Sequence, residues 1–157
     1  MVAALAIAGF CTPPAAAQNF MVGAQKCADC HKPETSVWEG SKHAASFKDI
    51  HRKPEVKDII AAVGGNANMR RNEVCVACHF SNTQASASAA PSATSGPSCE
   101  SCHGNASAWI SIHNDYGAGA KRETESPAHK AERIRKSAAA GMIWPSNLYD
   151  VAENCLS

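Results

Sequence analysis

The segments "CADCH" (27–31), "CVACH" (75–79) and "CESCH" (99–103) repeat one pattern, in which two cysteines three positions apart are followed directly by a histidine. The three copies use six of the eight cysteines and three of the seven histidines in this chain of 157 residues. A pattern that recurs three times in so short a chain indicates three equivalent attachment points for one chemical group. The chemistry of these points decides how the rest of the chain folds.

The C-x-x-C-H pattern is typical of a covalent attachment site for haem c. Two thiols about one helical turn apart reach the two vinyl groups on one edge of the porphyrin and form thioethers, and the adjacent histidine binds the iron. We therefore expect three covalently attached haems. The predicted thioether residues are Cys27, Cys30, Cys75, Cys78, Cys99 and Cys102, and the predicted proximal iron ligands are His31, His79 and His103.

Other uses of these cysteines explain less of the pattern. The cysteines of the second and third motifs have nearly the spacing of a zinc ribbon, but a zinc site leaves Cys27 and Cys30 without partners. A disulfide framework suits an exported protein but leaves the three following histidines unexplained. A thioredoxin-like redox motif needs a βαβ context, which the sequence does not indicate.

The composition agrees with a fold organised by a cofactor. Basic and acidic side chains number 15 and 14, so the net charge of +1 provides no basic field for nucleic acid. Alanine and serine are abundant and large apolar residues are few, which predicts a thin core for the length. Three large apolar rings, covalently held, would supply the missing core volume.

Each haem iron has a second axial position, and histidines outside the motifs are the candidates for it. These candidates are His43, His51, His113 and His129. His43 is expected to share a helical face with Gly40, which would let a ring approach, and with Phe47, which would pack on it. His113 follows Trp109 by four residues on one face. With histidine so plentiful, bis-histidine coordination is the expected state, with low-spin, six-coordinate iron.

Two further sets of residues leave open which side chains bind the iron and which hold the haem propionates. Met69 and Met142 are candidate sixth ligands, although methionine more often fills gaps in a core. His129 shares its expected helical face with Arg133 and Lys136, which could instead hold haem propionates.

The N-terminus is expected to be an export signal over residues 1–17. An apolar run of h-region length is followed by Ala15, Ala16 and Ala17 at the cleavage positions, and the run is too short to span a bilayer. No Lys or Arg precedes the run, so the signal lacks its basic n-region. Cys11 is expected to leave with the signal, and the domain over 18–157 is expected to be periplasmic or otherwise exported.

The remaining chain predicts short helices joined by long connections. We expect helices within Pro33–Lys48, from Pro54 to a stop at Gly64 and Gly65, and from an N-cap at Ser126 to a stop at Gly141. The Ser/Ala/Thr/Pro stretch over 81–98 has no period and is expected to be a flexible loop. The predicted fold class is mainly α, with helices and loops packed around covalently bound haems and little or no β-sheet.

The chain resembles the multihaem c-type cytochromes of the cytochrome c554 type. The resemblance is carried by the three C-x-x-C-H motifs, by "WEGSKHAASF" (38–47) and by "GPSCESCHGNASAWISIHNDYG" (96–117). It implies a mostly helical fold, haems in parallel or near-perpendicular pairs, and periplasmic electron transfer. It also implies a fourth C-x-x-C-H after a segment like "GMIWPSNLYDVAENC" (141–155), so we expect Cys155 to be the first half of a fourth attachment motif.

The function predicted from these features is an electron relay between redox partners through closely spaced, mostly bis-histidine haems. The expected partners are other cytochromes or a quinol-linked or periplasmic oxidoreductase, with no nucleic acid. The alternative is a haem enzyme, or a fragment of one, that reduces or oxidises a small nitrogen or sulfur compound at a five-coordinate haem. The sequence shows no added catalytic motif, which favours the carrier.

Overall fold

The computed structural model describes residues 19–156, so the predicted signal peptide over 1–17 and Cys11 lie outside the described residues. The described chain consists of short helices with one small sheet. The α-helices are α1 (Ala24–Ala28), α2 (Lys32–Glu39), α3 (Lys42–Asp49), α4 (Val56–Val63), α5 (Glu73–His79), α6 (Cys99–His103), α7 (Ile110–His113), α8 (Pro127–Ala139) and α9 (Leu148–Leu156). The 3-10 helices are η1 (Ile50–Arg52), η2 (Met69–Arg71) and η3 (Ala106–Ala108), and the strands are β1 (Ser81–Thr83) and β2 (Ser92–Ser95). The prediction of a mainly α fold with little sheet is confirmed.

Two of the predicted helices begin and end where the sequence signals place them. Helix α4 stops before Gly64, whose φ of 77° is a conformation that favours glycine. Helix α8 starts after Ser126, whose side chain accepts a hydrogen bond from the backbone N–H of His129 at 3.3 Å. Gly141, with φ of 97°, follows the end of α8.

The predicted helix over Pro33–Lys48 is instead two helices, α2 and α3. The break falls at Gly40 and Ser41, because the Ser41 side chain accepts from the Ala44 N–H at 3.2 Å and caps a new helix. The prediction that Gly40 shares a helical face with His43 is therefore wrong. Phe47 does lie on α3 with His43.

The segment 81–98, predicted as a flexible loop, contains both strands of the sheet. Strands β1 and β2 pair antiparallel, with an irregularity between Ser81 and Asn82. A side-chain hydrogen bond between the strands adds to the backbone pairing: the Thr83 hydroxyl donates to the Thr94 hydroxyl at 3.2 Å. The two strands could not be predicted from the composition of this stretch, because short polar side chains give no alternating apolar pattern.

A single serine fixes the sheet to the third motif. The Ser81 side chain is fully buried and accepts a hydrogen bond from the Ser98 N–H at 3.0 Å. Its oxygen also lies 2.8 Å from the Ser98 hydroxyl and 3.1 Å from the Gly96 carbonyl. The backbone before α6 is thus held by the end of β1.

The apolar core is small, as the composition predicts. One cluster of buried residues consists of Met69, Cys75, Val76 and Phe80. Phe47 of α3 meets Phe80 edge-on, with ring centroids 6.0 Å apart and planes at 82°. Several of the most buried side chains elsewhere are polar, which shows that hydrogen bonds hold much of this chain together.

The Glu100 carboxylate is the charged member of these buried polar groups. Its side chain is fully buried on α6. One oxygen, Oε1, accepts from the N–H groups of Val22 (2.9 Å) and Ala106 (2.8 Å), and Oε2 accepts from Gly23 N–H (2.7 Å). A carboxylate that accepts several backbone donors is well compensated for its burial. Glu100 therefore joins the start of the described chain to both ends of the third motif.

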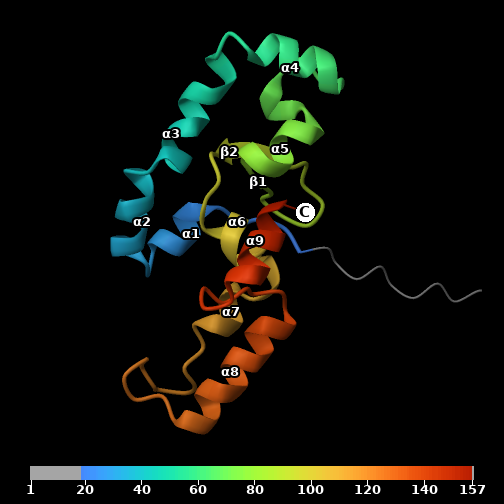
Figure 1. Cartoon of the computed structure of the whole chain (residues 1–157). Helices are drawn as coiled ribbons and strands as arrows, with labels where there is room; N and C mark the ends of the chain where they lie inside the picture. The colour runs from blue at the N-terminus through green and yellow to red at the C-terminus, as the bar shows by residue number, and fades with distance from the viewer. Residues whose placement is uncertain (1–18, 157) are drawn as a thin grey trace, which may run out of the picture.

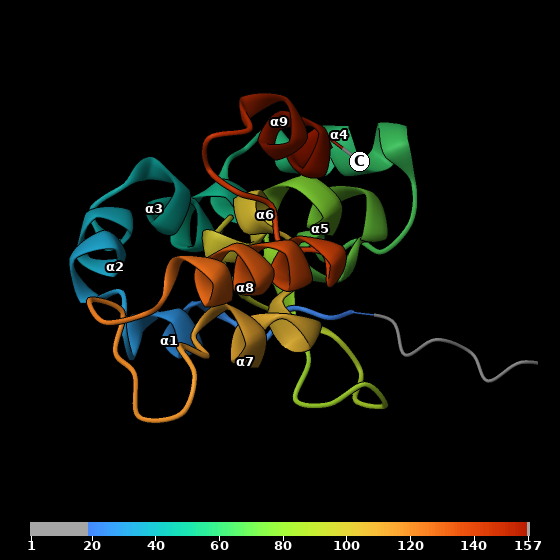
Figure 2. The same ribbon diagram turned by 90° about the horizontal axis from the view of Figure 1, so that it is seen from below.

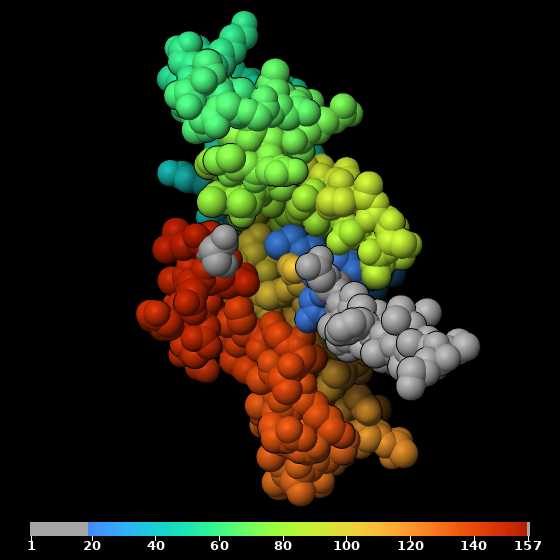
Figure 3. Space-filling view, turned by 90° about the vertical axis from the view of Figure 1, so that its right-hand side faces the viewer, coloured from blue at the N-terminus to red at the C-terminus, as the bar shows by residue number. Residues whose placement is uncertain are grey.

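The elements form an elongated arrangement (Figure 1). Helices α3, α4 and α5 lie at one end, α1, α6 and α9 lie in the middle, and α7 and α8 lie side by side at the other end, as Figure 2 also shows. In the space-filling view the first described residues lie between the α5 region and the α8–α9 region (Figure 3). The middle layer is where Glu100 makes its contacts.

Among residues 19–156, the helices are too short or too polar for any of them to cross a lipid bilayer.

Replacing Glu100 with glutamine should lower the free energy of unfolding of the holoprotein by about 2 kcal/mol. The amide oxygen can still accept from Val22 and Ala106, but the amide NH₂ then faces the Gly23 N–H, so two donors meet without an acceptor. Urea denaturation followed by circular dichroism measures the change. Glu132→Gln, at a half-exposed position on α8, is the matched control and should change stability by less than about 0.5 kcal/mol. Equal effects of the two changes would contradict the role given to Glu100.

Candidate functional site

Each of the three C-x-x-C-H motifs lies on a short helix or directly after one. The first spans α1 and the connection to α2, so that His31 is the residue before α2. The second lies on α5 and the third forms α6. On a helix, residues at i, i+3 and i+4 share a face, so the second and third motifs each present two thiols and an imidazole to one side.

Asn72 sets the start of the helix that carries the second motif. Its side-chain oxygen accepts from the N–H groups of Val74 (3.1 Å) and Cys75 (3.4 Å). Its amide group donates to the carbonyls of Gly64 (2.8 Å) and Asn66 (2.9 Å), which ties the motif to the end of α4. The residue is 1% exposed, so this cap is protected from water.

The third motif is capped reciprocally and its histidine is oriented. Ser98 and Ser101 form a capping box at the start of α6. At its other end, His103 Nδ1 lies 2.9 Å from the carbonyl of Ile143. A carbonyl can only accept, so Nδ1 carries the proton and Nε2 keeps its lone pair. His103 is thereby prepared as a ligand through Nε2.

The first and third motifs lie next to each other. Helices α1 and α6 are in contact, and the thiols of Cys27 and Cys99 interact directly. That contact with Cys99, together with burial, raises the pKa of the Cys27 thiol. The groups attached at these two motifs would therefore have neighbouring edges.

Within residues 19–156, no three side chains among His, Cys, Asp and Glu come together as a metal site, and this includes the cysteines of the second and third motifs.

His31 and His113 face each other across the site. Their ring centroids are 6.3 Å apart and their planes differ by 19°. His31 comes from the first motif and His113 from the end of α7, so only the tertiary fold brings them together. Of the four predicted distal candidates, His113 is the one whose ring meets a motif histidine among the described residues.

This pairing brings one of the four candidate distal histidines to the histidine of the first motif. The two imidazoles would be the residues that hold the iron of a haem attached there. The thiols of Cys27 and Cys30 precede His31 at the separation that the two vinyl groups require. The residues present therefore fit haem c at the first motif.

His113 is held in the protonation state and orientation that an iron ligand needs. Its Nδ1 lies 2.7 Å from the Ile110 carbonyl, which leaves Nε2 with the lone pair. Burial lowers the pKa of His113, and the nearby charges of His31 and Arg133 lower it further. The Trp109 ring packs edge-on at 5.2 Å, so the expected contact between these two residues is present.

His43 and His51 are placed near the motifs without a partner ring in the described chain. His43 is exposed on α3. A Cβ on Gly96 would collide with the His43 carbonyl and the Ser46 hydroxyl, so the glycine that allows close approach to α3 is Gly96. His51 lies on η1 with its Nδ1 buried, and that atom has no hydrogen-bond partner among residues 19–156.

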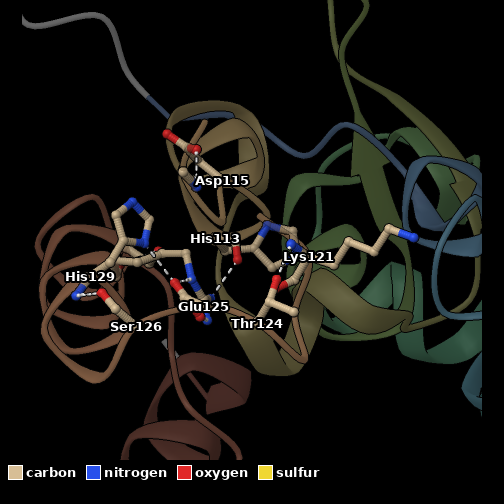
Figure 4. A network of polar contacts seen from close by, with 10 residues as sticks. His113, Asp115, Lys121, Thr124, Glu125, Ser126 and His129 are labelled. Carbon is tan, nitrogen blue, oxygen red and sulfur yellow. Dashed lines mark hydrogen bonds and ion pairs between the residues drawn. The ribbon is translucent and has the colours of Figure 1, made fainter. Parts of the chain in front are cut away.

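His129 belongs to a network with Glu125 and Arg133. Figure 4 shows Glu125 between His113 and His129. Glu125 Oε1 lies 2.7 Å from His129 Nδ1 and accepts from Arg133 Nε at 2.7 Å, while Oε2 accepts from Arg133 Nη2 at 2.6 Å. The Arg133 guanidinium is thus engaged by Glu125 and by the His113 carbonyl in this structure.

Sequence reasoning missed Glu125 and Glu100. For Glu125 the spacing gave only a partial signal, because Glu125, His129 and Arg133 are four residues apart but Glu125 lies just before Ser126, the N-cap of α8. For Glu100 no sequence signal exists, since it occupies a variable position inside a motif and its partners are backbone groups.

Cys155 lies beside the second and third motifs. It lines a small cavity of about 110 Å³ together with Cys78 and Ser101. Helix α9 packs on α6, and the Asn154 side chain donates to the Ser101 carbonyl at 2.8 Å. Burial and the proximity of Cys155 raise the pKa of the Cys102 thiol.

A larger cavity of about 850 Å³ lies behind the second motif. It is lined by Val76, Ala77 and Phe80 together with polar side chains that include Arg70 and Glu73. Val76 and Phe80 also pack with Cys75 of the second motif in the apolar cluster.

Comparison with known proteins agrees with this geometry. The family model described as "Cytochrome c554 and c-prime" matches residues 26–104, which is half of the chain. The chain is 29% identical over 103 residues to "Cytochrome c-554" from Nitrosomonas europaea, an alignment that covers 60% of this chain and 43% of that protein. The chain thus spans less than half the length of this curated relative. No solved structure matches it.

The stability of the protein should fall in acid through Glu125. The Arg133 guanidinium and the His129 imidazole hold the pKa of this carboxyl at about 2, below its ordinary 4.5. A lowered folded-state pKa contributes stability that is fully present above pH 4.5 and is lost as the pH falls towards 2.

Glu125→Gln should therefore be less stable than the wild type at pH 7, and the difference should shrink between pH 4.5 and pH 2. Urea midpoints measured across this range test it. Glu132→Gln is the control: the pKa of Glu132 is also lowered to about 2, but its side chain is 46% exposed and solvent screens its ion pair. A difference that does not depend on pH would contradict the prediction.

Proposed function

Because this chain belongs to the cytochrome c554 and c-prime family, we propose that it is a multihaem electron carrier with one haem c on each of its three C-x-x-C-H motifs. Membership of a c-type cytochrome family implies covalently bound haem c. We propose, beyond this, that there are three haems, that histidines bind their irons, and that electrons pass from one haem to the next. The observation that carries it is the pairing of His31 with His113 at 6.3 Å.

In this proposal the cysteine pairs of the three motifs form the thioethers, and His31, His79 and His103 are the proximal ligands. His113 is the distal ligand of the first haem. Its neutral imidazole, oriented through Nδ1 by the Ile110 carbonyl, presents Nε2 for binding. Two imidazole ligands keep the iron six-coordinate, which suits electron transfer rather than substrate binding.

The closeness of the motifs supports a relay. The contact between Cys27 and Cys99 brings one edge of the first haem next to one edge of the third. The haems supply the redox chemistry, whereas the chain fixes their separation and excludes water from their edges. Glu100, inside the third motif, keeps this spacing through its bonds to Val22 and Gly23.

The remaining histidines and Cys155 complete the proposal. His43, His51 and His129 are candidate distal ligands, and the Nδ1 of His129 bonds Glu125. Cys155 is a candidate thioether for a fourth haem, supported by its position beside Cys78.

We also propose that the protein acts outside the cytoplasm, in the periplasm or another exported compartment, with redox proteins as its partners. The signal-like residues 1–17 support this. Other cytochromes or a quinol-linked or periplasmic oxidoreductase are the expected donors and acceptors.

A second function, small-molecule chemistry at a five-coordinate haem, is favoured by one observation. Among residues 19–156, the ring contacts include no histidine facing His79 or His103 in the way that His113 faces His31. A haem with an open axial position can bind a small nitrogen or sulfur compound. Electron paramagnetic resonance of the oxidised protein separates the two functions, because wholly low-spin iron favours the carrier and a high-spin haem that binds nitrite or hydroxylamine favours the enzyme.

The intact mass of the purified holoprotein should exceed that of the polypeptide by the mass of three haems. Denaturing mass spectrometry measures this directly, because thioether-bound haem stays attached to the chain. Replacing both Cys75 and Cys78 with alanine should remove one haem from the count. A wild-type protein with fewer than three haems would defeat the proposal.

Replacing His113 with alanine should convert one haem from low-spin to high-spin and leave the others unchanged. The reason is that His113 is the only ring facing His31 among the described residues. Electron paramagnetic resonance measures the loss of one low-spin signal. Asn114→Ala, at the neighbouring exposed position, is the control and should keep every signal. An unchanged spectrum for His113→Ala would remove His113 from the ligand set.

A further inference from the structure

We propose that Arg133, held by Glu125, is the positioning residue that fixes His113 opposite His31. The inference rests on the proposed function, since it takes His113 as the distal ligand of the first haem. It concerns how the chain keeps that ligand in place. Arg133 itself touches neither ring.

The need for such a residue follows from the shortness of α7. This helix runs from Ile110 to His113, so it is about one turn long and has little stability of its own. His113 is its last residue, where backbone carbonyls have no partner within the helix. A ligand at the frayed end of one helical turn would not stay opposite its partner without outside support.

Arg133 supplies that support from α8. Its Nη1 donates to the His113 carbonyl at 2.6 Å, which satisfies the free carbonyl at the end of α7. Helices α7 and α8 lie side by side, and the guanidinium also lies over the Tyr116 ring at 5.0 Å. The arginine therefore reaches both the ligand residue and the chain that follows it.

Glu125 fixes the guanidinium in the orientation that this contact needs. Two parallel bonds join the carboxylate to Arg133 Nε and Nη2, at 2.7 and 2.6 Å, which leaves Nη1 directed to the His113 carbonyl. The Glu125 and Arg133 side chains are 2% and 10% exposed, so water does not compete for these bonds. His129 Nδ1 bonds the same carboxylate and holds it from the other side (Figure 4).

The same helix offers a matched arginine without this contact. Arg135 forms a similar two-bond pair with Glu132, through Nε at 2.8 Å and Nη2 at 2.7 Å. Its side chain is 67% exposed, and it makes no hydrogen bond to α7 among the described residues. Arg133→Gln and Arg135→Gln therefore remove equal charge from α8, and only the first releases His113.

The test measures the ligation of the first haem in the holoprotein. Arg133→Gln should convert a fraction of one haem to high-spin iron at room temperature, and the dithionite-reduced variant should bind more carbon monoxide than the wild type, up to one further equivalent. Glu125→Gln should give a smaller change in the same direction, because Arg133 stays but is no longer aligned. Arg135→Gln should match the wild type in both measurements.

If Arg133→Gln fails to fold, Arg133→Lys provides the second variant. Lysine keeps the charge beside Glu125 but cannot bond both carboxylate oxygens and the His113 carbonyl in one plane. It should raise carbon monoxide binding while urea denaturation shows a folded protein.

The outcomes separate this inference from the function on which it rests. Variants of Arg133 that lose stability but keep the wild-type spectrum and carbon monoxide binding would overturn the positioning role and leave Arg133 as packing. If His113→Ala also leaves the spectrum unchanged, then His113 is not a ligand and the proposed function fails at its first haem. A change in His113→Ala together with no change in Arg133→Gln overturns the positioning role alone.

Discussion

The buried Glu100 carboxylate is the interaction on which the rest of the structure depends. A charge without exposure to water is tolerated only when donors surround it, and here the donors are the backbone N–H groups of Val22, Gly23 and Ala106. Gly23 directly precedes α1, which carries the first cysteine of the first motif, and the third motif contains Glu100 itself. Their separation therefore depends on one side chain rather than on an apolar core, which is small in this chain.

The same arrangement recurs at two histidines of the site. A backbone carbonyl placed by the fold accepts a hydrogen bond from Nδ1, so that Nε2 keeps its lone pair: the Ile143 carbonyl for His103 and the Ile110 carbonyl for His113. Fixing the tautomer in advance reduces what a metal-binding histidine must reorganise. The backbone supplies both acceptors, so the orientation of these side chains depends on where helices end.

Much of the fold class and part of the site could be predicted from residue patterns. Helices with a strong N-cap or a terminal glycine, such as α8 and α4, begin and end as expected because capping is local. The break at Ser41 was missed because a serine inside a helical pattern caps only when the chain turns there. The sheet over 81–95 was missed because its pairing relies on serine and threonine hydrogen bonds, which leave no apolar period.

What the sequence by itself determined is the set of predicted attachment points, because the chemistry of C-x-x-C-H is contained in five adjacent residues and needs no distant partner. It also named four candidate distal histidines, of which His43 and His113 had the strongest local case. Only the tertiary structure decided that His113 faces His31, that Cys27 meets Cys99, and that Glu125 and Arg133 support the end of α7. These contacts join residues far apart in the chain, and such pairings are set by how helices pack rather than by any local pattern.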